Sequence, residues 1–136
     1  MIKFKFLKHT ADIKFQAFGK NLEDVFENSA LALKKSICRG EKIKEKKEKK
    51  LNVKGIDFES FLYNFLEEII YFLDADNFMI SKIKEIKIKN FTLKAVIMGD
   101  KASDYNFTNE VKAVTYNDMF VKQKEKKWTA QVVLDV

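Results

Sequence analysis

One segment of the chain is apolar around most of a helix, and this constrains the fold more than any other feature. A helix that is hydrophobic on most sides has to be buried among other elements. Asp57, directly before the segment, is suited to cap the first turn. We therefore expect residues 58–73 to form the central core helix. Its apolar positions are Phe58, Phe61, Leu62, Phe65, Leu66, Ile69, Ile70, Phe72 and Leu73.

A second helix is predicted after Asn21, which is a suitable N-cap. Glu23 and Asp24 follow in the first turn, where the helix dipole favours acidic side chains. Basic residues gather toward the other end, and Gly40 is suited to close it. One face of this helix is apolar and is formed by Leu22, Val25, Phe26, Leu33 and Ile37.

The other apolar stretches have the short, partly alternating patterns of β-strands. The order is two strands, a helix, a strand, a helix and then a run of strands. This order predicts an α+β fold with a mostly antiparallel sheet and two packed α-helices. With 136 residues, no Pro and four Gly, residues 1–136 are expected to form a single domain. The expected strands are 2–8, 13–18, 51–54, 83–89, 91–98, 110–116, 119–123 and 128–136. Residues 99–109 are expected to form a polar loop and residues 117–118 a short turn.

The chain is basic, with 26 Lys and Arg against 20 Asp and Glu, a net charge of +6. Arg39 is its only Arg, and bidentate recognition of phosphates or bases favours Arg over Lys. The composition therefore permits RNA binding without selecting it. The charge run at 41–50 is expected to be a solvated loop or edge strand, with a basic RNA contact as the alternative.

Most enzyme chemistry is excluded by the residue inventory. His9 is the only His and Cys38 the only Cys, so zinc sites and most nucleophile–base pairs lack their components. No phosphate-binding glycine motif is present. Cys38 is expected to be a buried structural thiol, and the chain is expected to be non-catalytic. Residues 74–77 begin like an EF-hand loop, but the required Gly and Glu are not at the right spacing.

No apolar stretch is long enough to span a bilayer. The N-terminus alternates Lys with Phe, which is unlike a secretory signal. A cytoplasmic protein without membrane contact is the resulting prediction.

Binding of a metal ion by carboxylate oxygens is the one remaining chemistry that the residues can support. The final strand ends with Asp135 beside the terminal carboxylate of Val136, and Asp12 interrupts the strand pattern near the N-terminus. Hard divalent cations prefer clusters of such oxygens. If the first and last strands are neighbours, these carboxylates converge. The alternative is that Asp12 is a turn residue and Asp135 a surface acid.

Five segments carry a more specific signal: residues 9–12, residues 21–28, the capped helix ending at Leu73-Asp74, residues 109–116 and residues 134–136. The most specific are His-Thr-Ala-Asp and Glu-Val-Lys-Ala-Val-Thr-Tyr. In these segments, which run in order along essentially the whole chain, the chain resembles the archease family.

The resemblance implies an activator of the GTP-dependent RNA ligase of tRNA splicing. Such a protein promotes guanylylation of the ligase and its multiple turnover, meets tRNA only indirectly and has no small-molecule substrate of its own.

The resemblance also implies a divalent-metal site, with Ca²⁺ expected first and Mg²⁺ or Mn²⁺ as alternatives. Asp12, Asp135 and Val136 would be the ligands. Lys112 would be a basic residue near the site that faces the partner, and His9 with Thr10 would shape the loop that carries Asp12.

Two positions depart from the family pattern. Asn117 stands where the family usually has His, and residues 102–105 lack a His often found in that loop. Any role of those histidines does not transfer to this chain. The competing hypotheses are a lysine-rich RNA-binding or tRNA-modification accessory module that acts without the ligase, and a chaperone-like protein.

Overall fold

The computed structural model describes residues 2–9 and 11–136. In these residues two α-helices and seven strands are formed, and every strand pair is antiparallel, which confirms the α+β prediction. In chain order the elements are β1 (Phe4–Leu7), β2 (Ile13–Gly19), α1 (Leu22–Ile37), β3 (Lys47–Lys54), α2 (Phe58–Asp76), β4 (Phe78–Lys89), β5 (Thr92–Lys101), a 3₁₀ turn (Ala102–Asp104), β6 (Ala113–Lys124) and β7 (Lys127–Asp135).

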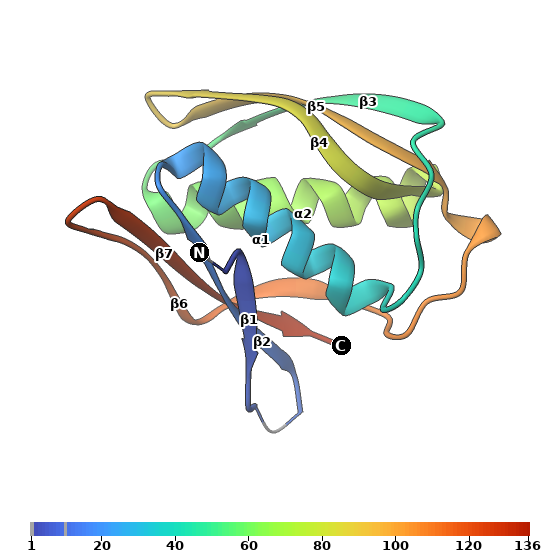
Figure 1. Ribbon diagram of the computed structural model, residues 1–136, viewed down its shortest axis with the longest axis horizontal. Coiled ribbons are helices and arrows are strands. Elements are labelled where there is room, and N and C mark those ends of the chain that lie inside the picture. Colours follow the sequence, from blue (N-terminus) through green and yellow to red (C-terminus); the bar gives the residue numbers. More distant parts are fainter. Residues whose placement is uncertain (1, 10) are drawn as a thin grey trace.

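The strands form two sheets, whereas the sequence predicted one. One sheet has the order β1-β2-β7-β6 and the other the order β3-β5-β4. The helices form a layer between them (Figure 1). The reason lies in α2, whose apolar side chains cover much of its circumference and have to be covered from more than one side. No helix in the described part of the chain is long and apolar enough to cross a membrane.

Aromatic side chains join the two helices at the centre of the core. Phe26 of α1 lies 4.9 Å from Phe61 and 5.4 Å from Phe65 of α2, measured between ring centroids. All three side chains are completely buried and belong to one cluster that includes residues of both sheets. Burying a side chain of this size contributes about 1.5–3 kcal/mol. The central core position predicted for the helix that begins at Phe58 is confirmed.

Both helices begin at the predicted caps. The side chain of Asn21 accepts a hydrogen bond from the Asp24 N–H at 2.8 Å. Asp57 accepts from the Ser60 N–H at 2.7 Å, and the Asp57 backbone N–H donates to the Ser60 hydroxyl at 3.2 Å. These caps satisfy N–H groups that have no partner within the helix.

The end of α2 is later than predicted. The helix continues to Asp76, and Asn77 ends it in the left-handed conformation with φ 52°. Asp74 and Asp76 therefore lie in the last helical turn and form no EF-hand-like loop. Instead, the Asp76 carboxylate pairs with Lys49 at 3.2 Å. Acidic residues do not stop a helix by themselves, but a residue with positive φ does.

The segment 99–109, predicted to be a polar loop, is partly strand. β5 runs through Asp100, which is almost fully buried. The Tyr105 hydroxyl donates to the Asp100 carboxylate at 2.6 Å, and the Lys101 N–H donates at 2.8 Å. These bonds, the Tyr105 bond foremost, hold the pKa of Asp100 below its usual value. A carboxylate that accepts these two hydrogen bonds can occupy a buried strand position.

Cys38 follows α1 and is buried, as predicted for a structural thiol. Burial raises the pKa of its thiol. Burial also lowers the pKa of nearby Lys34, whose ammonium donates to the Ser81 carbonyl at 2.9 Å. Burial therefore favours the protonated thiol at neutral pH.

Candidate metal site

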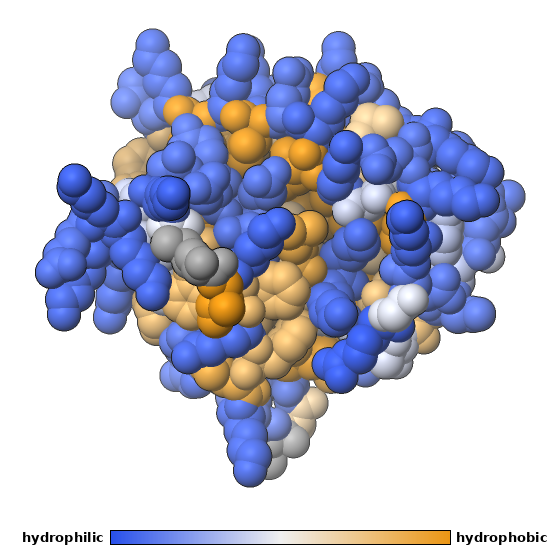
Figure 2. Space-filling model, viewed as in Figure 1, coloured by the Kyte–Doolittle hydropathy of each residue, from blue (hydrophilic) through white to orange (hydrophobic). Residues whose placement is uncertain are grey.

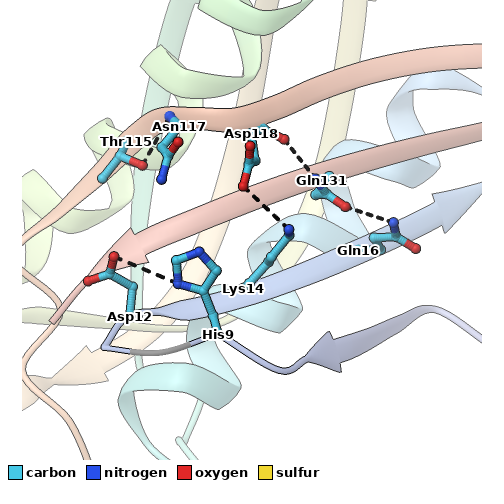
Figure 3. A network of polar contacts seen from close by, with 8 residues as sticks. All are labelled: His9, Asp12, Lys14, Gln16, Thr115, Asn117, Asp118 and Gln131. Atoms are coloured by element: carbon cyan, nitrogen blue, oxygen red, sulfur yellow. Dashed lines mark hydrogen bonds and ion pairs between the residues drawn. The ribbon is translucent and has the colours of Figure 1, made fainter.

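The four-stranded sheet brings Asp12 and Asp135 to the same end of neighbouring strands. Ile13, the first residue of β2, pairs with Leu134 of β7 in antiparallel register. Asp12 directly precedes Ile13 and Asp135 directly follows Leu134, so the two acids stand beside each other across the ladder. Figure 3 shows Asp12 beside the end of β7. The neighbour of the last strand is β2 and not β1, which pairs only with β2.

Lys112 lies on the other side of Asp135. Its backbone N–H donates to the Asp135 carbonyl at 2.8 Å, and the next residue, Ala113, pairs with Asp135 in the β6–β7 ladder. The Lys112 side chain is exposed. Asp135 therefore lies between an acid on β2 and a lysine that leads into β6.

His9 lies near Asp12 without bonding to it. The His9 Nδ1 and Asp12 Oδ2 atoms are 3.9 Å apart, which is too long for a hydrogen bond. Nδ1 is inaccessible to solvent and has no hydrogen-bond partner among the described residues. An unsatisfied buried polar atom costs about 1–3 kcal/mol, so this position of the His9 ring is unfavourable. Thr10 lies outside the described residues, and its role stays a prediction.

A hollow of about 530 Å³ opens beside His9 and Asp12. Basic side chains also line it, among them Lys14 and Arg39, and the Arg39 guanidinium lies 5.7 Å from the centre of the Phe6 ring. The hollow therefore combines one carboxylate with several cations. It is unsuited to enclose a metal ion.

The outer face of the same sheet carries a polar network that sequence reasoning missed (Figure 3). The Lys14 ammonium lies 3.5 Å from the Asp118 carboxylate. Gln131 donates to the Asp118 carbonyl at 2.8 Å, and Gln16 donates to Gln131 at 2.9 Å. The available signal was the alternation of polar residues with apolar ones in β2 and β7, which marks an outward face.

An irregular stretch of β6 supplies the acid of this network. The register of β6 against β7 shifts between Thr115 and Phe120, and Asp118 has a positive φ of 55°. The Asn117 N–H donates to the Thr115 hydroxyl at 3.2 Å. The predicted turn at residues 117–118 is therefore a bulge inside one long strand. A bulge of this kind re-aims side chains, here Asp118 toward Lys14.

Two acids of α2 hold β6 in place and were also missed. Glu67 accepts from the Val114 N–H at 3.0 Å, and Glu59 accepts from the Val121 N–H at 2.9 Å. No local pattern indicates these bonds, because each joins residues far apart in the chain. They anchor the strand that starts next to Lys112.

The predicted ligands suit a hard cation. Asp12 and Asp135 carry carboxylate oxygens, which Ca²⁺ and Mg²⁺ prefer, and Val136 is the third predicted ligand. In residues 2–9 and 11–136, no group of three or more His, Cys, Asp or Glu side chains is close enough to hold a metal ion. A metal at this strand end therefore has to take main-chain or terminal oxygens in addition to the two Asp side chains.

The fold and the strand end define a small α+β protein with helices between two antiparallel sheets. The profile of the Archease protein family (MTH1598/TM1083) matches residues 4–136, and the chain belongs to that family.

Relatives match over nearly the whole chain. The protein archease of Methanosarcina mazei is 36% identical over 140 residues, covering 98% of this chain and 96% of that protein. The protein archease of Pyrococcus abyssi is 37% identical over 143 residues, with all of both chains covered.

Two solved structures share the fold. The solution structure of Methanobacterium thermoautotrophicum protein 1598 has a TM-score of 0.83 at 32% identity, covering 98% of this chain and 99% of that one. The crystal structure of a Thermotoga maritima archease, described as a possible chaperone, has a TM-score of 0.69 at 20% identity, covering 97% and 96%. At that identity the second likeness concerns the fold alone.

Proposed function

We propose that this chain is a metal-binding accessory protein that activates the GTP-dependent RNA ligase of tRNA splicing in the cytoplasm. Membership of the archease family supports an accessory role for the chain. The observation that carries the proposal is the register of β2 and β7, which sets Asp12 beside Asp135. In this role the chain promotes guanylylation of the ligase and its multiple turnover, and catalyses no step itself.

The physical basis is charge. A bound divalent cation would neutralise phosphate charge during transfer of a nucleotide to a protein. Asp12, Asp135 and Val136 are the proposed ligands, for Ca²⁺ first and Mg²⁺ or Mn²⁺ otherwise. Lys112, attached to Asp135 by its backbone N–H, adds an exposed positive charge next to them. The strand end with Asp12 and Asp135 thereby presents carboxylates and the Lys112 ammonium side by side to the mouth of a partner's active site.

The test is single-turnover guanylylation of the ligase with wild-type protein and with Asp12→Asn and Asp135→Asn. We expect both variants to lose Ca²⁺ binding in titration calorimetry and to lose most of the stimulation. Asp74→Asn is the matched control, because Asp74 is an exposed acid at the far end of α2. Chelator should abolish the wild-type stimulation and added metal should restore it.

The possible failures separate the two parts of the proposal. Normal stimulation by both Asp variants would overturn the proposal that a metal at Asp12 and Asp135 is needed, and would leave the activator role intact. Absence of any stimulation by the wild-type protein, with metal present, would overturn the role itself.

A chaperone-like activity is the second candidate, because the Thermotoga maritima relative is described as a possible chaperone. It predicts that the purified protein protects unrelated unfolded proteins from aggregation. If a stoichiometric amount of this protein prevents aggregation of an unrelated protein and has no effect on the ligase, chaperone-like activity is favoured over activation of the ligase.

A further inference from the structure

The outer face of the three-stranded sheet carries a cluster of exposed lysines. Side chains alternate between the two faces of a strand. In β3 and β5 the alternate residues, such as Leu51 and Leu93, are buried toward the helices. Hydrophilic side chains project from this sheet, away from the helices, at the top of Figure 2. The lysine face, as we name it, consists of Lys50, Lys54, Lys87, Lys89 and Lys94, all exposed.

The register places like charges against each other on this face. Lys94 stands directly opposite Lys87, and Lys54 and Lys89 flank Thr92 from the two sides. Like charges directly opposite on a sheet destabilise it. None of the five lysines forms an ion pair within residues 2–9 and 11–136.

The other end of the same sheet is neutralised. Lys82 pairs with Glu45 at 3.0 Å and Lys84 pairs with Glu48 at 3.3 Å. The chain therefore balances its charge at one end of the sheet and leaves positive charge at the other, where Glu85 is the only acid on the face.

Protection of sheet edges explains only part of the cluster. Lysines on edge strands prevent pairing with other chains, and β3 and β4 are the edges of this sheet. Lys94, however, lies on β5, the central strand, whose backbone is paired on both sides. A lysine there protects no edge and faces another lysine, so it requires a different explanation.

The residue types select the partner. The cores of protein–protein interfaces are depleted in Lys and enriched in aromatic residues and Arg, and this face has neither an aromatic side chain nor an Arg. Stacking of bases needs aromatic side chains, and reading of bases favours Arg. Lysine is a compact point charge that suits phosphates. We infer that the lysine face binds the phosphate backbone of RNA without reading its sequence.

The lysine face and the Asp12–Asp135 edge belong to different sheets, on opposite sides of the helix layer (Figure 1). RNA bound to the lysine face therefore leaves the Asp12–Asp135 strand end accessible to a protein. The choice of RNA over DNA rests on the proposed function. If both proposals hold, the protein touches RNA directly while its metal edge meets the ligase.

The test is fluorescence anisotropy of a labelled, unstructured RNA oligonucleotide titrated with the full chain at several salt concentrations. Five phosphate contacts to a single strand give a slope of log affinity against log salt of about −3.5. Affinity should accordingly fall about 100-fold between about 50 and 200 mM salt. A DNA strand of the same sequence should bind comparably, because the phosphates carry the affinity.

The variant Lys50→Gln/Lys87→Gln/Lys94→Gln should bind at least ~10-fold more weakly at low salt, with the slope reduced by about 2. The matched control is Lys20→Gln/Lys124→Gln/Lys126→Gln, which removes the same charge from exposed positions outside the lysine face. We expect the control to keep the wild-type slope. The single variant Lys94→Gln should reduce the slope by about 0.7 and guards against failure of the triple variant to fold.

Equal slopes for the lysine-face variants and the control would overturn the inference. So would polyglutamate that competes as well as RNA at matched charge, because the face would then be a site for acidic protein. Stimulation of the ligase is measured separately, so loss of RNA binding leaves the metal-edge proposal standing, and the reverse also holds.

Discussion

The two sheets share one core but differ in what their outer faces do with charge. At the centre of the four-stranded sheet, Lys14 is paired with Asp118 and Gln16 with Gln131, and the directly opposed Lys124 and Lys127 lie only beside the turn that joins β6 and β7. On the three-stranded sheet, Lys87 faces Lys94. Surface charges can be paired within the folded chain, as Lys14 and Asp118 are. Where lysines stay unpaired, as on the three-stranded sheet, an external partner of opposite charge is indicated.

The sheets are also held to the rest of the molecule differently. The four-stranded sheet is tied to α2 by carboxylates that accept strand N–H groups, as Glu67 does from Val114. The three-stranded sheet is tied at its end by a side-chain bond between Tyr105 and Asp100. Single substitutions can remove each of these hydrogen bonds, or part of the shared core, separately.

The largest effect is expected from Phe61→Ala, because Phe61 is fully buried and its ring contacts Phe26 at 4.9 Å and Phe91 at 5.9 Å between centroids. Removing a buried phenyl ring costs about 3–5 kcal/mol of the free energy of unfolding. Urea unfolding followed by Trp128 fluorescence reports the four-stranded sheet, and amide exchange in β5 reports the other. Both should shift together.

The control for this substitution is Tyr71→Ala, an aromatic position on the same helix that is more than half exposed. It should leave stability nearly unchanged. Loosening of only one sheet in the Phe61→Ala variant would show that the two sheets do not share a cooperative core.

Glu67→Ala should have an intermediate effect confined to the four-stranded sheet. It leaves the Val114 N–H without its charged acceptor, and such a bond contributes about 1.5–3 kcal/mol. Native-state amide exchange should accelerate at Val114 while β5 keeps its protection. Glu68→Ala, one residue along the same helix, is the control, and an equal loss of stability in both variants would contradict the assigned tie.

The smallest effect is expected from Tyr105→Phe, because the Lys101 N–H still holds Asp100. The Tyr105 hydroxyl is the main cause of the lowered pKa of Asp100, so this pKa should rise toward the usual value in the variant. A carboxyl whose pKa is lowered by folding stabilises the protein above its unfolded pKa of about 3.9 and loses that contribution as pH falls through the folded pKa.

The stability difference between wild type and Tyr105→Phe should therefore be present at neutral pH and shrink in acid. Urea unfolding at several pH values and NMR titration of the Asp100 carboxyl measure it, with Tyr71→Phe as control. A difference that is independent of pH would mean that the hydroxyl does not act through Asp100.

Local features of the fold could be predicted because their physics is local. Asn21 and Asp57 cap N–H groups three residues away, and Asn77 ends α2 through its own backbone conformation. The polar stretch around Asp100 was misread as a loop, because its hydrogen-bond partner Tyr105 belongs to the segment that follows the strand. The start of β4 at Phe78, before the predicted residue 83, was missed because no alternation marks a strand that is buried on both sides.

The candidate site divides in the same way. Asp12, Asp135 and Lys112 were found from residue type and family resemblance, and the structure brings their backbones to one strand end. Asp118 and Glu67 were not found, because their partners are separated from them by long stretches of chain. The roles of the carboxylates as ligands and of Lys112 toward a partner stay predictions.

The sequence by itself determined the helices, the apolar stripe that has to be buried and the carboxylates near both ends of the chain, because composition and short-range spacing encode these. Only the tertiary structure decided that the strands divide into two sheets, that β2 lies beside β7, and that Lys94 faces Lys87 on a central strand. The physical reason is that register and sheet order depend on which distant segments cover the central helix, and no local pattern specifies that choice.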